Sequence, residues 1–263
     1  MPIRPVVATL AAALVAALAA ALVAAFTVGC SLAQAPLGPD EIVAAFISES
    51  QDEARTFHME WQGTMSTTMS WPDTPPGQEI TGSINASFDF SGDDFAGAMT
   101  TRTGFLGLPG GQTDPFGSTT AYARVRGVFF VRYTQSGWER MEANWQGQSE
   151  FDPLHGLAAE GVVYEAGETI DSVVLHRLRV VDPGSALNAS LFSGSAELTP
   201  DDGSEFLIYV DPQGVPVRAQ LRLSGQVALG VDLGDFIPPA TYQLSFDYVF
   251  TAWGEDFYIS PPT

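Results

Sequence analysis

The chain has 263 residues, of which 31 are acidic and 11 are basic, and it contains no lysine. A net charge of -20 repels phosphate backbones and anionic head groups. This argues against a nucleic-acid partner and excludes adhesion to a membrane through a basic patch. Hydrophobic residues make up 45% of the chain and 17 residues are Phe, so a core of ample size is available.

The first thirty residues are typical of an export signal. Arg4 precedes an Ala-rich apolar run at positions 6–26, and small residues then lead to Cys30. Cys30 is the only cysteine, so it cannot form an internal disulfide. The segment Thr27-Val28-Gly29-Cys30 resembles the bacterial lipoprotein box, in which the Cys is lipidated and becomes the new N-terminus. The alternative is an uncleaved membrane anchor, because about 20 apolar residues span a bilayer. Ala is only weakly apolar, so an Ala-rich run makes a poor anchor, and we favour lipidation of Cys30.

This interpretation divides the chain into a signal peptide at 1–29, a lipidated tether at 30–38 and a single domain at 39–263. We expect the domain to be a monomer on the extracytoplasmic face of the cell membrane. The acyl chains on Cys30 would hold it there, since two or more chains give stable attachment.

The domain begins with a predicted amphipathic helix that ends near Arg55. Asp40 and Glu41 lie in its first turn, and their charges, like that of Arg55 near the end, suit the helix dipole. The stripe expected to be buried comprises Val43, Phe46, Ile47, Ser50 and Ala54.

From Phe57 the spacing of the apolar residues changes from near 3.6 to 2, which marks antiparallel strands with one wet face and one apolar face. Turns such as Arg126-Gly127 and Asp211-Pro212-Gln213-Gly214 separate the strands. Two further helices are predicted at 152–159 and 183–192. The ten predicted strands lie at 57–62, 83–90, 94–103, 119–126, 128–134, 161–168, 173–181, 205–211, 217–227 and 242–250.

So many strands with one apolar face each can close into a barrel, pair as a sandwich, or curl into an open half-barrel. The three helices favour the half-barrel. We therefore expect a mainly β fold with a few helices (α+β), in which a curled antiparallel sheet of about ten strands has its concave apolar face covered by the helices. The glycine-rich segment Gly104–Gly117 is either a mobile lid or a plain surface loop.

The order of segments adds a family resemblance. The lipidated Cys and the helix ending near Arg55-Thr56-Phe57-His58 come first. Later segments are Gly137-Trp138-Glu139, the run at 168–178, the hairpin at 208–218, and the closing Phe246-Asp247-Tyr248-Val249-Phe250 with Ile259-Ser260-Pro261-Pro262. Together they resemble the LppX/LprG lipoprotein family, whose fold is similar to that of the LolA and LolB lipoprotein carriers.

This resemblance implies a cradle of about eleven strands. The cradle would shelter acyl chains of a lipid or lipidated molecule during transfer through the cell envelope. Two features depart from the pattern. Ser172 stands where a turn Gly is expected, and the glycine-rich loop after Thr103 is longer than usual.

The apolar strand faces are rich in aromatic residues, which supply the candidate ligand-lining set. From the pattern alone these residues fill a solid core, whereas the family resemblance implies that part of the hollow stays unfilled. The candidate cavity-lining residues are Trp61, Ala86, Phe88, Phe90, Ala219, Leu221, Leu223, Leu244, Phe246 and Tyr248.

The residue types that could bind a metal or act in catalysis are not spaced in the sequence as such a site would require. His58, His155 and His176 fall on different predicted elements without ligand spacing, and His58 and His176 occupy polar strand positions. We therefore expect no catalytic residues, no metal and no cofactor, and a protein that is not an enzyme. The alternative to a lipid carrier is a sensor or interaction module of the same fold that binds a protein partner in the envelope.

Overall fold

The computed structural model describes residues 36–52, 54–69, 78–106, 116–134, 136–141, 151–155, 157–170, 172–184, 196–229 and 240–262. The chain divides into two units, Met1–Leu37 and Gly38–Thr263. The predicted signal peptide, Cys30 and most of the tether lie outside the described residues. Within the described ranges, no helix is both long and apolar enough to cross a membrane.

Helix α2 (Pro39–Gln51) opens the second unit. Pro39 occupies the first turn, and the Glu41 carboxylate accepts a hydrogen bond from the Gly38 N–H at 2.8 Å, as expected at a helix start. The helix ends four residues before Arg55, because the backbone is already extended at Asp52, whose carboxylate accepts from the Ala54 N–H. The buried side chains are Ile42, Phe46, Ile47 and Ser50, so Ile42 takes the place predicted for Val43 and Ala54 is exposed.

A single twelve-stranded sheet forms the rest of the unit, and the ten predicted strands are all present in it. Strands β6 and β9 are additional, since three and five residues are too short to show alternation in the sequence. The strands are β1 (Thr56–Met69), β2 (Gln78–Ser91), β3 (Asp94–Leu106), β4 (Phe116–Val125), β5 (Val128–Tyr133), β6 (Glu139–Met141), β7 (Val162–Ile170), β8 (Val173–Val180), β9 (Ala196–Pro200), β10 (Glu205–Val210), β11 (Pro216–Leu229) and β12 (Ala240–Thr251).

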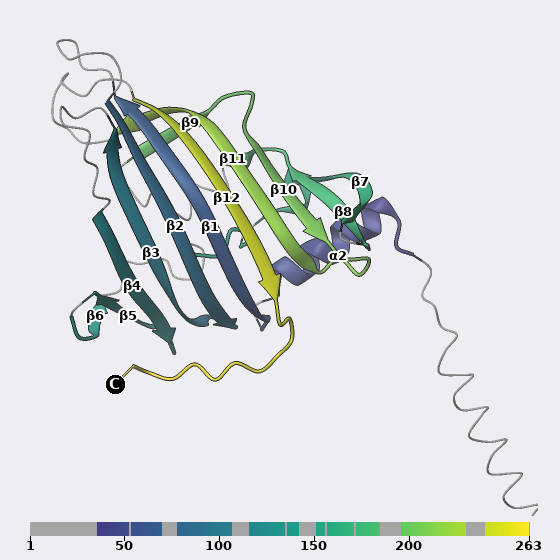
Figure 1. Cartoon of the computed structure of the whole chain (residues 1–263). Coiled ribbons are helices and arrows are strands. Elements are labelled where there is room, and N and C mark those ends of the chain that lie inside the picture. Colours follow the sequence, from purple (N-terminus) through teal and green to yellow (C-terminus); the bar gives the residue numbers. More distant parts are fainter. Residues whose placement is uncertain are drawn as a thin grey trace, which may run out of the picture. The chain divides into compact units, whose positions relative to one another are not determined.

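The sheet is antiparallel throughout, in the order β6-β5-β4-β3-β2-β1-β12-β11-β10-β8-β7, and β9 pairs with the far end of β11 (Figure 1). Among the described residues β6 and β7 do not pair, so the sheet is curled but not closed into a barrel. The predicted fold class is confirmed. Strand β3 continues to Leu106 and strand β4 begins at Phe116, so both ends of the expected glycine-rich loop belong to strands. Residues 107–115 lie outside the described residues.

The helix predicted at 152–159 is wrong. The chain there forms turns at 153–155, followed by the short 3-10 helix η2 (Ala159–Gly161). At the start of this segment the Asp152 carboxylate accepts from the Leu154 N–H at 3.0 Å and also pairs with Arg55. Of the helix predicted at 183–192, Pro183 and Gly184 are helical and the remainder lies outside the described residues.

The concave apolar face is therefore covered only partly by helices. Helix α2 packs against β7 and η2, at the β7 end of the sheet (Figure 1). Phe151, in a non-helical segment, stacks on Phe88 of β2 with ring centroids 4.7 Å apart.

The β7–β8 hairpin accounts for Ser172. Ile170 pairs directly with Val173, which leaves a two-residue turn, and Ser172 has a φ of 68°. Two-residue hairpin turns require positive φ, which glycine adopts at least cost. A glycine would therefore fit this turn better than Ser172, as the family pattern leads one to expect.

Candidate ligand-binding face

All ten candidate cavity-lining residues lie on one face of the sheet, which we call the inner face. They come from the four central strands β2, β1, β12 and β11, and each is at most 8% exposed. The register places them side by side: Trp61 pairs with Ala86 and with Tyr248, and Tyr248 pairs with Ala219. Residues paired across antiparallel strands share a face. Strands distant in the sequence therefore form one continuous apolar surface.

One end of the inner face is filled by aromatic side chains. Phe57 stacks on Phe90 and on Trp253, with ring centroids 4.6 and 4.7 Å apart. Phe88 contacts Phe90 and Phe95 and stacks on Phe151. Here the solid-core interpretation describes the packing, and Phe88 and Phe90 belong to this cluster.

Further along the strands, large side chains lie flat over glycines of neighbouring strands. A Cβ added to Gly63 would overlap the ring of Phe246, and one added to Gly82 would come 2.8 Å from Met65 Cγ. A glycine lacks the Cβ that would hold a neighbouring ring away from the backbone. The side chains of Phe246 and Met65 therefore lie close to the backbone of the neighbouring strand in this region.

Trp61 occupies the centre of the inner face. Its indole stacks on Tyr248 with centroids 5.5 Å apart and an interplanar angle of 14°, and Phe246 lies 5.6 Å away. Trp61 Nε1 and the Tyr242 hydroxyl are the buried side-chain polar atoms that have no hydrogen-bond partner within the described residues. No pattern in the sequence distinguishes these two donors from the other aromatic residues.

A buried ion pair, formed by Arg55 and Asp152, lies beside the aromatic cluster at the filled end of the inner face. Arg55 and Asp152 have side chains 2% and 0% exposed, and their charged groups are in direct contact. The same guanidinium donates to the Ser50 carbonyl at the end of α2 and lies 5.2 Å from the Phe57 ring centroid. Arg55 thus meets the last turn of the helix, as predicted, but from outside the helix.

This burial has electrostatic consequences. Desolvation raises the pKa of Asp152, and the charge of Arg55 offsets only part of the increase. Desolvation likewise raises the pKa of Tyr248, and the negative charge of Asp152 raises it further. The phenol of Tyr248 is therefore neutral at physiological pH. Sequence reasoning missed this pair because its members are 97 residues apart.

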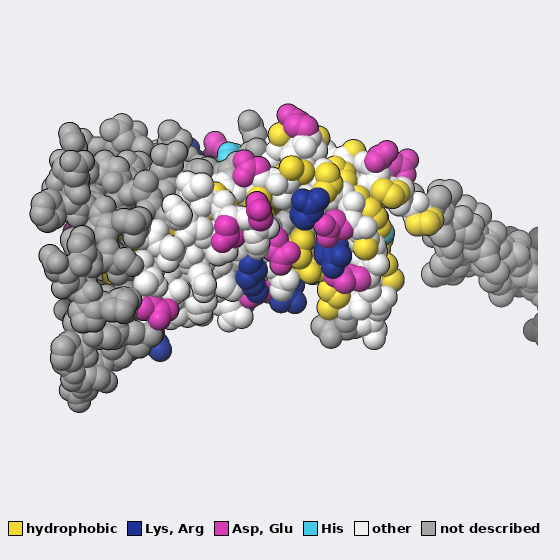
Figure 2. All heavy atoms as spheres, turned by 90° about the horizontal axis from the view of Figure 1, so that it is seen from above, with side chains coloured by type: hydrophobic (Ala, Val, Ile, Leu, Met, Phe, Trp, Pro, Cys, Tyr) yellow, Lys and Arg dark blue, Asp and Glu magenta, His cyan; other side chains and the backbone are white. Residues whose placement is uncertain are grey.

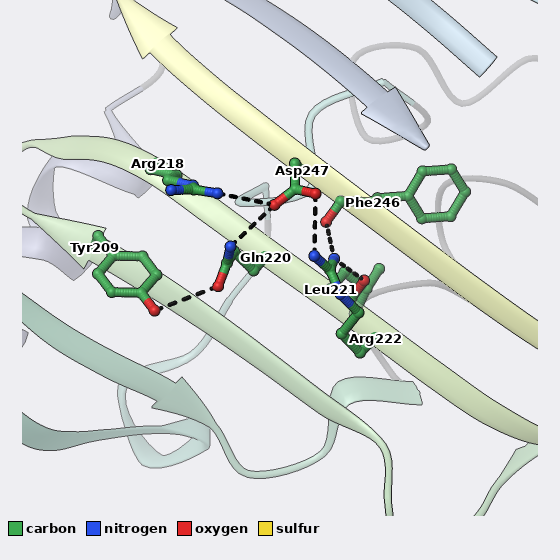
Figure 3. A network of polar contacts seen from close by, with 7 residues as sticks. All are labelled: Tyr209, Arg218, Gln220, Leu221, Arg222, Phe246 and Asp247. Carbon is green, nitrogen blue, oxygen red and sulfur yellow. Dashed lines mark hydrogen bonds and ion pairs between the residues drawn. The ribbon is translucent and has the colours of Figure 1, made fainter. Parts of the chain in front are cut away.

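The opposite face of the sheet, the outer face, is polar. Asp247 of β12 accepts hydrogen bonds from Arg218, Gln220 and Arg222 of β11 at 3.0 to 3.2 Å, and Tyr209 of β10 donates to Gln220 (Figure 3). Figure 2 shows arginine and acidic side chains next to one another on the visible surface, with uncharged polar groups between them. The ion pairs join β11 to β12, and the hydrogen bond from Tyr209 adds β10 to the network.

The pKa of Asp247 reflects these contacts. Partial desolvation acts to raise the pKa, but the hydrogen bonds from Gln220 and Arg218 and the charge of Arg222 outweigh it and lower the pKa below its usual value. An open groove beside Asp247 and Arg218 is lined mainly by polar side chains, including Glu60, Gln62 and Asn85.

The histidines lie apart from one another. His58 lies on the outer face with its Nδ1 2.7 Å from an Asp89 carboxylate oxygen, and His155 is exposed. His176 of β8 is half-buried; it pairs with the buried Val210, and its Nδ1 lies 3.1 Å from the Tyr164 hydroxyl. Among the residues that the structure describes, no three His, Cys, Asp or Glu side chains are grouped as a metal ion would require.

No family model and no curated protein matches the sequence. A DUF1329 family protein from Desulfovibrio piger has 13% identity and a TM-score of 0.27, over 84% of this chain and 93% of that chain. A β-barrel-like protein of the DUF1849 domain from Brucella abortus has 12% identity and a TM-score of 0.26, over 76% and 98%. A putative outer membrane lipoprotein-sorting protein domain from Vibrio parahaemolyticus has 10% identity and a TM-score of 0.24, over 84% and 94%. At TM-scores this low the likenesses support no inference about function.

Proposed function

We propose that this chain is an exported lipoprotein, anchored through Cys30, that binds acyl chains of a lipid or lipidated molecule on the inner face of its curled sheet and carries them through the cell envelope. The observation that carries the proposal is the continuous apolar inner face, built by β2, β1, β12 and β11, in which side chains lie flat over Gly63 and Gly82. The resemblance of the segment order to the LppX/LprG lipoproteins supports it.

The energetics of an acyl chain fit a carrier that needs no catalytic residues. Exposing a sixteen-carbon chain to water costs on the order of 12 kcal/mol, at about 0.8 kcal/mol per methylene. A bilayer already removes that cost, so the inner face has only to match the bilayer for transfer to be reversible. A dry apolar surface of suitable shape meets this requirement, and we propose accordingly that the protein is not an enzyme.

Tryptophan substitutions at the small inner-face residues test the proposal. Ala86 and Ala219 are buried beside Trp61 and Tyr248, so an added indole must enter the space above the inner face. If that space takes a ligand, Ala86→Trp or Ala219→Trp should reduce co-purifying lipid while the melting temperature of the lipid-free protein stays unchanged. Ala98→Trp is the matched control, because Ala98 pairs with Ser87 on the outer face and should alter neither quantity.

The competing interpretation gives the opposite result. In a close-packed core, each inner-face indole should destabilise the protein by about 1–3 kcal/mol or more. Strong destabilisation by both substitutions, together with a parent protein that contains no lipid by mass spectrometry, would rule out the carrier and leave the sensor or interaction module.

A further inference from the structure

The indole N–H of Trp61 is a donor without an acceptor. The side chain is 4% exposed, and Nε1 has no hydrogen-bond partner in the described part of the chain. Buried polar groups in proteins are nearly always paired. A hydroxyl such as that of Tyr242 can rotate toward a partner, whereas the indole N–H direction is set by the ring. Trp61 is therefore the stronger indication of a missing acceptor.

None of the described neighbours of Trp61 on the inner face supplies an acceptor for its N–H. One ring face is stacked on Tyr248, and the directly paired residue on β2 is only an alanine, Ala86. Along β1 and β12 toward Tyr242, the inner-face positions are Gly63 with Phe246 and Met65 with Leu244. An apolar strip thus extends from the indole along the strands.

The apolar surroundings of Trp61 favour a neutral acceptor. Its side chain is 4% exposed and lies among Tyr248, Phe246 and Ala86. A ligand carboxylate or phosphate buried there without a countercharge would carry a large desolvation cost. An uncharged carbonyl oxygen carries a much smaller one.

We propose that Trp61 Nε1 donates a hydrogen bond to the carbonyl oxygen of an acyl ester, whose hydrocarbon chain then lies along the strip toward Tyr242. The inference rests on the proposed function and adds a specificity: the protein selects ester-linked acyl lipids over ether-linked ones. Trp61 and Tyr242 are separated by six strand positions, or roughly 20 Å. An acyl chain of one bilayer leaflet is about 15 Å long, so one ester does not serve both donors.

A competition between two uncharged lipids tests this specificity. The full chain, purified by affinity tag in mild detergent, is incubated with equal amounts of dioleoylglycerol and its di-O-oleyl ether analogue, washed, and analysed for bound lipid by mass spectrometry. The wild-type protein should retain about fivefold more ester than ether, the ratio that one neutral hydrogen bond supplies. Trp61→Phe should bring the ratio to about one by reducing the ester bound.

Two variants serve as matched controls. Tyr242→Phe removes the other unpaired donor and should keep the wild-type ratio, and Tyr209→Phe removes a hydroxyl that already donates to Gln220 on the outer face and should do the same. The ester-to-ether ratio, and not stability, is the readout for Trp61→Phe, because this substitution removes both an unpaired donor and part of the indole packed on Tyr248.

The outcomes separate the two proposals. If wild type binds both lipids equally, or if Trp61→Phe keeps the ester preference, the role of Trp61 is overturned while acyl binding stands. If wild type binds neither lipid, the proposed function itself fails.

Discussion

Replacing Arg55 with Met should remove a large part of the stability of the domain, because it leaves the Asp152 carboxylate buried without its partner. The two side chains are 2% and 0% exposed, so water cannot replace the guanidinium without opening the structure. The substitution also removes the hydrogen bond to the Ser50 carbonyl at the end of α2.

The magnitude follows from the burial. Removing one partner of a buried ion pair costs about 3–5 kcal/mol, whereas replacing both partners with apolar residues of similar size is often neutral or stabilising. The total free energy of unfolding of a protein is typically about 5–15 kcal/mol. Arg55→Met should therefore lower the urea concentration at the unfolding midpoint strongly. The double variant Arg55→Met/Asp152→Leu should recover most of the loss, apart from about 1 kcal/mol for each of the two lost hydrogen bonds, one to the Ser50 carbonyl and one from the Leu154 N–H.

Urea denaturation followed by circular dichroism measures these differences at pH 7, on the wild type, both single variants and the double variant. A double variant as unstable as Arg55→Met would refute the reasoning. The loss would then arise from the contacts of Arg55 with Ser50 and Phe57 rather than from an unpaired carboxylate.

Three further predictions concern other parts of the chain. Gly63→Ala should destabilise the domain by about 1–3 kcal/mol or more in the same denaturation assay, because the new methyl group overlaps the Phe246 ring, whereas Gly117→Ala has only ordinary contacts and should change stability little. The fold lowers the pKa of Asp247, so the contribution of its charge to the free energy of unfolding is complete above its unfolded pKa of about 4 and is lost as the pH falls through the folded pKa. The difference in unfolding free energy between wild type and Asp247→Asn should shrink over that pH range. A constant difference would contradict the assignment. Cys30→Ala should release the protein from the membrane fraction or leave an unprocessed precursor, and cell fractionation that finds a processed, membrane-bound variant would contradict lipidation.

The composition of the inner face could be predicted from the sequence because side chains along a strand alternate strictly between two faces. Once Trp61, Ala86, Leu221 and Phe246 were placed on strands, their parity put each on the apolar side. That reasoning required no knowledge of which strands are neighbours. It was weaker at β8, where Leu175 and Leu178 are both buried although they are three positions apart.

Only the tertiary structure decided how the inner face is filled. The ring of Phe246 covers Gly63 because β1 pairs with β12, a contact between residues 183 positions apart (246 minus 63) that no local pattern encodes. The segment after Asp152 has apolar residues at helical spacing but forms turns at 153–155, and Asp152 itself pairs with the distant Arg55. Alternation is a local property of the chain. Register and the pairing of buried charges depend on strands that meet only when the whole sheet has formed.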